Sequence, residues 1–276
     1  MNGHLELIQE GTRVLEEAQV HRPQWTAEQL LAERVGCLPV DLYAMEFKIL
    51  RGDLLLYRAD VAARANGVPL QYLLGTADFY GRRFAVGPGV FNPRPETEVL
   101  VETVLELLGG CQVVADVGTG SGIIAVTLAK ERPNLEVIAI EQSSVALHFA
   151  RRNAATQGCR VRFLQGNLLE GLKPCSVDGI VANLPYLNPD QSSAWSRELA
   201  WEPWLALDGG KGGLELIETL IRQAAGLLEP ERWLALEIGM DQAPRVRELA
   251  EQNGFRVERT IQDLSGLDRV AVLWKN

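Results

Sequence analysis

A run of closely spaced glycines follows an apolar segment in the middle of the chain. Residues 116–122 read Asp-Val-Gly-Thr-Gly-Ser-Gly, with glycine at Gly118, Gly120 and Gly122. Glycine lets the backbone turn tightly and approach a ligand that any Cβ atom would exclude. Glu141 ends the next predicted strand, from which a carboxylate can accept hydrogen bonds from both hydroxyls of a ribose. Together the two features predict a site for a nucleoside cofactor.

The spacing of the glycines distinguishes two kinds of nucleoside cofactor. A dinucleotide fingerprint needs a glycine at position 123, where this chain has Ile123. The G-x-G-x-G pattern preceded by Asp116 instead resembles motif I of class I methyltransferases, which bind S-adenosyl-L-methionine. That cofactor carries a sulfonium cation and no pyrophosphate, so it needs no anion-binding loop. The pattern therefore favours a methyltransferase over a dehydrogenase, and over a plain turn between a strand and a helix.

The tetrapeptide Asn183-Leu184-Pro185-Tyr186 follows a second apolar segment, at 179–182. It resembles the [ND]-P-P-[YF] motif of methyltransferases that act on planar NH₂ groups, either in amides or in adenine. The Asn183 side-chain oxygen and the Leu184 carbonyl can each accept one N–H hydrogen, which helps a poorly nucleophilic nitrogen to pyramidalise. Pro185 fixes φ and holds the preceding carbonyl rigidly, and Tyr186 can stack on the planar group. These four residues are the predicted catalytic residues.

The tetrapeptide departs from that motif at Leu184, where proline is usual. Because the role inferred for this position belongs to the backbone carbonyl, we expect leucine to be tolerated. The same four residues also resemble the motif of rRNA adenine dimethyltransferases, and Asn, Pro and Tyr are common in ordinary turns. Taken alone, the tetrapeptide leaves both an amide and an adenine open as the methyl acceptor.

Three further parts of the chain resemble one family. They are residues 71–75 (Gln-Tyr-Leu-Leu-Gly) with 79–80, residues 91–98 (Phe-Asn-Pro-Arg-Pro-Glu-Thr-Glu), and residues 202–210, which contain Glu-Pro and Leu-Ala-Leu-Asp-Gly-Gly. All are similar to segments of the peptide chain release factor glutamine methyltransferases, the PrmC/HemK family. The resemblance implies methyl transfer from S-adenosyl-L-methionine to the side-chain amide nitrogen (N5) of the Gln in the Gly-Gly-Gln motif of class I release factors. An adenine N6-methyltransferase acting on RNA or DNA, and a non-catalytic cofactor-binding protein, are the alternatives.

The resemblance also implies which residues hold the cofactor, by their positions in the family's motifs. The implied residues are Gly118, Thr119, Gly120, Ser121, Gly122, Glu141, Asn167, Leu168, Asn183, Phe91 and Arg94. The glycine motif would contact the methionine and ribose parts, and Asn167, where an acid is commoner, would lie near the adenine with Leu168. The alternative role for Arg94 is an ion pair with Glu96 or Glu98. The alternative role for Phe91 is a place in the core of the hairpin.

Composition and charge exclude several other classes of protein. The chain has 276 residues, of which 47% are hydrophobic and 23% charged, as is typical of a globular protein. Asp+Glu number 36 against 27 Lys+Arg, a net charge of −9, so we expect no direct binding to nucleic acid. The cysteines and histidines lack metal-ligand spacing. We therefore expect the thiols to be free, the protein to hold no metal, and its location to be cytoplasmic. No apolar run reaches ~18 residues, so we expect no membrane span, and nothing demands more than a monomer.

Hydrophobic patterning predicts the elements that must position these residues. Residues 1–69 are expected to form a helical substrate-recognition domain, 70–95 a β-hairpin linker, and 96–276 an S-adenosylmethionine-dependent methyltransferase domain. In this last region we predict helices at 98–108, 123–131, 145–157, 214–228 and 243–252, and strands at 113–117, 136–140, 160–165, 179–182, 233–238, 255–260 and 269–274. The alternation predicts an α/β fold, a class I (Rossmann-like) methyltransferase sheet with helices on both faces. Ligands on such sheets bind at the carboxyl ends of the strands.

Two further expectations concern individual side chains. Thr26 with Gln29 resembles a capping box that opens the second helix. Trp195, Trp201 and Trp204 cluster in sequence near the tetrapeptide, where we expect them to anchor a loop rather than to stack on the substrate.

Overall fold

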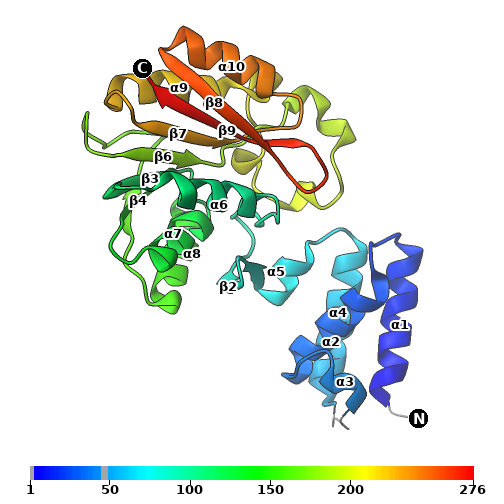
Figure 1. The fold of residues 1–276 in the computed structure, drawn as a ribbon. Coiled ribbons are helices and arrows are strands. Elements are labelled where there is room, and N and C mark those ends of the chain that lie inside the picture. Colours follow the sequence, from blue (N-terminus) through cyan, green and yellow to red (C-terminus); the bar gives the residue numbers. More distant parts are fainter. Residues whose placement is uncertain (1–2, 45–48) are drawn as a thin grey trace. The chain divides into compact units, whose positions relative to one another are not determined.

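The computed structural model describes residues 3–44 and 49–276, which form two compact units. The helical unit comprises the chain up to Thr76 together with the short segment Ser196–Trp201. The sheet unit comprises Ala77–Trp195 and Glu202–Asn276. Figure 1 shows the elements of each unit along the chain.

The helical unit is built from short helices packed around a small apolar core. They are α1 (Gly3–Glu17), α2 (Pro23–Val35), α3 (Asp41–Ala44), α4 (Arg51–Ala65) and α5 (Leu70–Leu74). Leu15, Leu30 and Tyr57 are fully buried in this core, and the Tyr57 hydroxyl donates to the Leu7 carbonyl at 3.0 Å. Helix α4 ends directly before Asn66-Gly67, and Gly67 has a φ of +96°, which suits glycine.

Two elements of this region differ from their predicted form. Helix α2 begins at Pro23, three residues before the expected capping residue Thr26, because proline has the φ of a first helical turn. Thr26 lies inside the helix and is buried. In the segment predicted as a hairpin, residues 70–74 are helical, and the hairpin itself is confined to β1 (Thr76–Phe79) and β2 (Arg82–Ala85). Tyr80 and Gly81 both have positive φ, as a two-residue hairpin turn requires.

The described strands β3 to β9 form one seven-stranded sheet in the order β5-β4-β3-β6-β7-β9-β8. Their bounds are β3 (Val113–Val117), β4 (Glu136–Glu141), β5 (Arg162–Gln165), β6 (Gly179–Ala182), β7 (Trp233–Glu237), β8 (Phe255–Gln262) and β9 (Asp268–Lys275). Strands β3 to β7 pair in parallel, and β9 is antiparallel to both of its neighbours. The order reverses at β3, so the carboxyl ends of β3, β4 and β6 are the place where this sheet can hold a ligand.

Helices cover both faces of the sheet, as predicted (Figure 1). They are α6 (Thr97–Leu107), α7 (Ile123–Glu131), α8 (Ser144–Gln157), α9 (Glu215–Leu227) and α10 (Ala243–Gln252). Ala115 and Ile180 pack with α9 and α10, whereas the adjacent residues Val114 and Val181 pack with α6 and α7. Successive strand residues point to opposite faces, so a strand covered on both sides is apolar at most positions, with Asp116 in β3 and Glu237 in β7 as buried exceptions. This explains the mainly apolar runs from which the strands were predicted.

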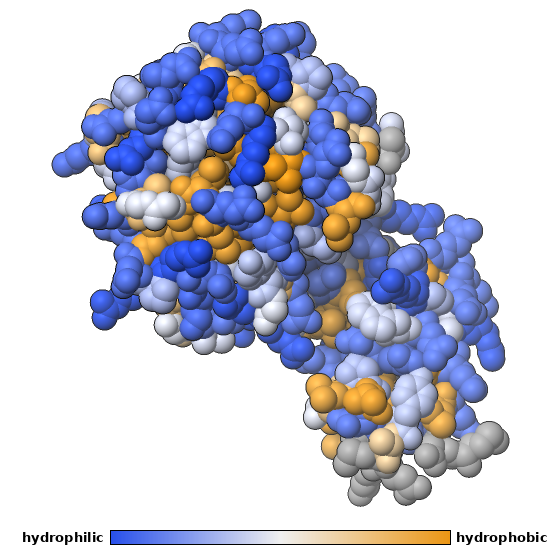
Figure 2. All heavy atoms as spheres, in the orientation of Figure 1, coloured by the Kyte–Doolittle hydropathy of each residue, from blue (hydrophilic) through white to orange (hydrophobic). Residues whose placement is uncertain are grey.

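The surface of the helical unit keeps several large apolar side chains exposed. Leu38, Val40 and Tyr43 are more than half exposed, as are Leu50 and Leu55. Figure 2 shows apolar residues gathered on the surface of this unit. Among the described residues, no helix has the length and apolar character that crossing a bilayer would require.

Candidate active site

The two sequence motifs lie next to each other at the carboxyl edge of the sheet. Val117 at the end of β3 pairs with Ala182 at the end of β6, so Gly118 and Asn183 leave adjacent strands at the same level. A Cβ atom on Gly118 would lie 3.0 Å from Leu184 Cδ2 and 3.9 Å from the Asn183 carbonyl oxygen. The structure therefore brings the glycine motif and the tetrapeptide into direct contact.

Asp116 anchors the glycine motif from inside the sheet. Its side chain is fully buried, and one carboxylate oxygen accepts hydrogen bonds from the Thr119 hydroxyl at 2.5 Å and from the Ala125 N–H at 3.0 Å. Burial raises the pKa of Asp116 to about 7. Because the Thr119 hydroxyl turns inward to Asp116, any contact of Thr119 with a cofactor falls to its backbone. Ser121 is also buried, and its carbonyl accepts from the Asn153 side chain at 2.8 Å.

The three glycines of the motif all have left-handed backbone conformations but meet different surroundings. Gly118, Gly120 and Gly122 have φ values of +71°, +57° and +83°. A Cβ on Gly122 would lie 3.0 Å from the Ala150 Cβ, so this glycine permits close packing against helix α8. A Cβ on Gly120 would meet no protein atom within 4 Å. Gly120 thus faces open space into which a ligand can approach the backbone, which fits a nucleoside cofactor.

Glu141 lies at the end of β4, beside the glycine motif. One carboxylate oxygen accepts from the Gly120 N–H at 2.9 Å, and the other accepts from the Ser143 N–H at 2.8 Å. These bonds fix the orientation of the carboxylate, and each oxygen keeps a second lone pair for a ribose hydroxyl. The Ser143 side chain in turn caps helix α8, by accepting from the Ala146 N–H.

Asn167 and Leu168 follow β5, which is separated from β6 and its tetrapeptide by β4 and β3. Asn167 is exposed, and its N–H donates to the Glu170 carboxylate at 3.1 Å. Leu168 has a φ of +51°, and its side chain is buried in the cluster beneath α9. A contact between Leu168 and an adenine therefore falls mainly to its backbone.

The tetrapeptide at the end of β6 is held by its side chains as well as by its backbone. The Asn183 side-chain N–H₂ donates to the Thr97 hydroxyl at 3.1 Å, which leaves the amide oxygen at the opposite end of the group. Leu184 is 4% exposed and packs in the sheet core against Gly118. Leucine in place of proline thus adds apolar packing under the turn. Burial raises the pKa of Tyr186 above its ordinary value, so its phenol stays protonated.

The backbone of the tetrapeptide is enclosed by the glycine-rich segment around residues 209–213. A Cβ on Gly209 would lie 2.8 Å from the Pro185 carbonyl oxygen, and a Cβ on Gly213 would lie 2.1 Å from that of Tyr186. Only glycine allows these backbones to approach so closely. The Gln242 side chain completes the enclosure, since its N–H₂ donates at 3.1 Å to the carbonyls of both Tyr186 and Gly213.

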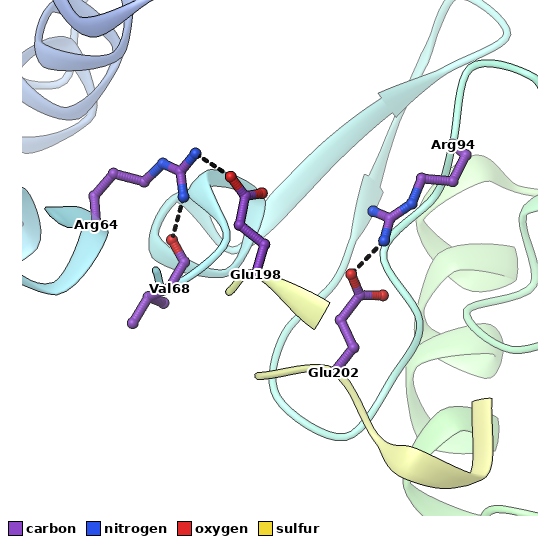
Figure 3. Close-up of polar contacts among 5 residues, drawn as sticks. All are labelled: Arg64, Val68, Arg94, Glu198 and Glu202. Atoms are coloured by element: carbon purple, nitrogen blue, oxygen red, sulfur yellow. Dashed lines mark hydrogen bonds and ion pairs between the residues drawn. The ribbon is translucent and has the colours of Figure 1, made fainter. Parts of the chain in front are cut away.

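Arg94 forms its ion pair with Glu202, so the alternative pairing with Glu96 or Glu98 is wrong (Figure 3). Glu202 is buried, and its second oxygen accepts from the Asn92 N–H at 3.1 Å. A buried carboxylate held between a guanidinium and a backbone N–H is a stronger partner than an exposed glutamate nearby in sequence.

The ring of Phe91 lies beside this ion pair. The Arg94 guanidinium carbon is 4.8 Å from the centre of the Phe91 ring, within the range of a cation–π contact. The Arg94–Glu202 pair therefore fixes residues 91–94 as one rigid stretch before helix α6. The candidate cofactor residues Phe91 and Arg94 belong to this stretch.

The loop after the tetrapeptide contributes to both units. Its segment Ser196–Trp201 belongs to the helical unit, where the Arg64 side chain donates to Glu198 and to the Val68 carbonyl (Figure 3). In the sheet unit, the rings of Trp195 and Trp204 pack at 5.2 Å, and the Trp204 indole N–H donates to Asp208 at 3.0 Å. Trp195 and Trp204 thus contact each other within this loop, whereas Trp201 is 49% exposed.

Glu237 is a site residue that sequence reasoning missed. It ends β7, is 2% exposed and lies beside Asn183. Burial raises the pKa of Glu237 to about 7, although hydrogen bonds from Thr97 and Asn183 and the charge of Arg269 lower it. The charges of Glu237 and Glu96 each raise the pKa of Tyr186. An acid at the end of a run of buried apolar residues was the signal that could have identified it.

The raised pKa of Glu237 predicts a pH-dependent loss of stability. The folded protein holds the Glu237 proton more tightly than the unfolded chain, whose pKa is about 4.3, so stability falls as pH rises from about 4.3 to about 7. Glu237→Gln removes this contribution. Asp116, whose pKa is also raised to about 7, contributes equally to the wild type and the variant, so its effect cancels in their difference. In urea unfolding, we expect the free energy of unfolding of the variant, relative to that of the wild type, to increase by on the order of 2–3 kcal/mol between about pH 5 and about pH 8. A difference that is constant with pH would show that Glu237 does not titrate in this window.

Comparison with known proteins identifies relatives of both units. The family described as Methyltransferase small domain matches residues 82–201, and the PrmC N-terminal domain matches residues 6–75. The release factor glutamine methyltransferase of Geobacter sulfurreducens is 40% identical over 258 residues, covering 93% of this chain and 91% of its own. That of Neisseria gonorrhoeae is 44% identical over 224 residues, covering 80% and 82%. A solved ribosomal protein L11 methylase from Lactobacillus delbrueckii subsp. bulgaricus has the same fold, with a TM-score of 0.52 at 22% identity, covering 69% of this chain and 84% of its own.

Proposed function

Because the chain belongs to the family of release factor glutamine methyltransferases, we propose that it methylates the glutamine of the Gly-Gly-Gln motif in class I peptide chain release factors. The methyl group comes from S-adenosyl-L-methionine and is transferred to the side-chain amide nitrogen, N5. The observation that supports this function most directly is the contact between the glycine motif and the Asn183 tetrapeptide. A donor site and an amide-binding turn then lie at one edge of the sheet.

The residues around the glycine motif fit the cofactor. Gly118 and Gly120 let the backbone approach the methionine and ribose parts, Glu141 accepts from the ribose hydroxyls, and Asn167 and Leu168 border the adenine. Phe91 and Arg94 line the same side, held by Glu202. When bound, S-adenosyl-L-methionine supplies a methyl group activated by a sulfonium. The acidic character of the site suits a cation.

The tetrapeptide prepares the substrate amide for methyl transfer. The Asn183 oxygen and the Leu184 carbonyl each accept one N–H of the glutamine carboxamide, which orients the nitrogen lone pair and weakens its conjugation with the carbonyl. Tyr186 packs on the planar group, and its phenol stays neutral. Such positioning can supply several kcal/mol, up to about 7–11 in the best intramolecular systems. The amide proton leaves after the methyl group has been gained, so the site needs no base to remove it beforehand.

The three regions of the chain have different roles in this function. We assign residues 1–69 to recognition of the release factor, residues 70–95 to the linker and residues 96–276 to catalysis. The exposed side chains Leu38, Val40 and Tyr43 supply apolar surface for a protein partner. We further propose that the enzyme acts as a monomer in the cytoplasm and does not bind nucleic acid directly. The acidic balance of the chain, with a net charge of −9, disfavours the alternative of adenine methylation in RNA or DNA.

Labelling with radioactive cofactor tests the choice of substrate. The protein is incubated with methyl-labelled S-adenosyl-L-methionine and either a purified class I release factor or total RNA. We expect label in the release factor and none in the RNA. Labelled RNA beside an unlabelled release factor would favour the adenine alternative and overturn the proposed function.

A substitution in the substrate locates the acceptor atom. Changing the Gln of the Gly-Gly-Gln motif to Glu removes the NH₂ group, so methylation of that release factor is expected to fall to background. Mass spectrometry of the unchanged factor should place a single methyl group on the glutamine side chain. Undiminished labelling of the Glu variant would show that the methyl group goes elsewhere.

A further inference from the structure

We propose that Thr97 and Glu237 act as positioning residues that fix the Asn183 carboxamide with its oxygen toward the substrate. We call this pair of residues the amide cradle. The inference rests on the proposed function and deepens it, because it explains how the acceptor of the substrate N–H is kept in its working orientation.

The topology places the three side chains together. Ala182 pairs with Leu236, so Asn183 and Glu237 are the next residues of two adjacent parallel strands. Thr97 begins helix α6, which contacts β7, and is fully buried. The amide cradle therefore combines a helix start and a strand end that are 140 residues apart in sequence, and both bear on the same asparagine.

The hydrogen-bonding groups of the amide cradle orient the Asn183 carboxamide. The Asn183 N–H₂ donates to the Thr97 hydroxyl oxygen at 3.1 Å. Glu237 lies beside Asn183 on the neighbouring strand, and hydrogen bonding to the Thr97 and Asn183 side chains favours its ionised form, which lowers its pKa against the effect of burial. When Glu237 is ionised, its carboxylate attracts the one hydroxyl hydrogen of Thr97, and Thr97 then offers only lone pairs to Asn183. With Glu237 ionised, both cradle residues are thus acceptors toward the asparagine.

This arrangement discriminates between the two orientations of a group whose ends are similar in size. Turning the carboxamide over would place the Asn183 oxygen against the oxygens of Thr97 and ionised Glu237, which repel it. It would also present N–H₂ to the N–H₂ of the substrate, where two donors face each other. Only the orientation observed leaves an acceptor for the glutamine amide.

The cost of burying Glu237 suggests that the fold itself does not need an acid there. One carboxylate oxygen has no hydrogen-bond partner within the described structure, and the residue is 2% exposed. A buried carboxylate is expensive, and an apolar side chain of similar size is often neutral or stabilising in its place. A structural role for Glu237 therefore predicts that Glu237→Leu lowers Tm, whereas a positioning role predicts that it lowers kcat without lowering Tm.

Substitution of Thr97 tests the cradle against a matched control. Thr97→Val removes the hydroxyl that binds Asn183, while Thr103→Val removes a buried hydroxyl of the same helix whose one hydrogen bond within the described residues is to the Val99 carbonyl. We expect kcat of Thr97→Val to fall by about 10- to 100-fold, as for other residues that orient a functional group. The KM for the release factor and the calorimetric Kd for S-adenosyl-L-methionine should stay near wild type, and Thr103→Val should match wild type throughout. Equal kcat values for the two variants would overturn the proposal.

Substitution of Glu237 supplies the second arm. We expect Glu237→Leu to lose kcat as Thr97→Val does, with an unchanged cofactor Kd and a Tm no lower than that of wild type. Glu237→Gln keeps an acceptor oxygen and should recover part of the loss. Because both residues act on one amide, the double variant should be little worse than either single one. A Glu237→Leu protein with normal kcat, or with activity lost only in proportion to lowered Tm or cofactor affinity, would contradict the proposal.

The experiment also separates failure of the cradle from failure of the proposed function. The wild-type protein is first shown to methylate the release factor. An inactive wild type would refute the proposed function, whereas an active wild type with an equally active Thr97→Val variant would refute the cradle alone.

Discussion

Asn183→Ala is expected to reduce turnover of the release factor to near background while leaving cofactor affinity almost unchanged. The substitution removes one of the two acceptors for the substrate amide, and comparable losses of a polar group in the site of charge rearrangement cost about 10²- to 10³-fold in kcat. The cofactor depends instead on the glycine motif and Glu141, and it is the Asn183 carbonyl oxygen that lies near this motif, 3.9 Å from the position of a Cβ atom on Gly118.

The measurement pairs single-turnover methylation with calorimetric titration of S-adenosyl-L-methionine. Asn188→Ala is the matched control, since Asn188 lies five residues further along the same loop and, in the part of the chain that the structure describes, its side chain accepts only from the Asp190 N–H. We expect the control to turn over normally. If Asn183→Ala also turned over normally, Asn183 would have no part in the mechanism.

Gly120→Val is expected to abolish cofactor binding, with a Kd raised by about 100-fold or more, which corresponds to ~2.7 kcal/mol. A Cβ at this position projects into space that no protein atom occupies within 4 Å, where the cofactor must approach the backbone. The branched side chain also disfavours the left-handed backbone that presents the Gly120 N–H to Glu141.

Gly158→Val separates exclusion of the cofactor from backbone strain. Gly158 has a φ of +62°, close to that of Gly120, and a Cβ there also meets no atom within 4 Å, but it lies at the end of helix α8. Both variants should lose stability to a similar extent, and only Gly120→Val should lose binding in the titration. Equal cofactor affinity in the two variants would place the cofactor elsewhere.

The sheet could be predicted closely because each element carries a local pattern. Strands covered on both faces appear as mainly apolar runs, and β3 and β6 have the predicted bounds, as do α7 and α10. The antiparallel placement of β9 between β7 and β8 could not be foreseen in this way, because pairing partners are not encoded in the periodicity of a strand.

Predictions from neighbouring residues were wrong at three places in the chain. Helix α2 begins at Pro23 because the ring of proline suits a first turn better than the threonine three residues later. Residues 70–74 form a helix although aromatic residues and glycines follow them. The partner of Arg94 lies 108 residues away at Glu202, whereas the sequence suggested neighbours.

The candidate site was predictable only where its residues form contiguous motifs. The glycine motif and the tetrapeptide each stand in one short stretch, and parallel strand ends must meet at one edge. Thr97, Glu237 and Gln242 reach the same tetrapeptide from three other places in the chain. Their roles depend on which strands are neighbours, so they became visible only in the folded structure.

The central claim is that the Asn183 oxygen and the Leu184 carbonyl hold the substrate carboxamide beside the methyl donor. A crystal structure of the protein with S-adenosyl-L-homocysteine and a Gly-Gly-Gln peptide tests it most directly. We predict that the glutamine side-chain nitrogen lies about 2.7–3.2 Å from both oxygens and faces the sulfur. A glutamine nitrogen hydrogen-bonded to other groups, or a cofactor sulfur remote from the tetrapeptide, would contradict the claim.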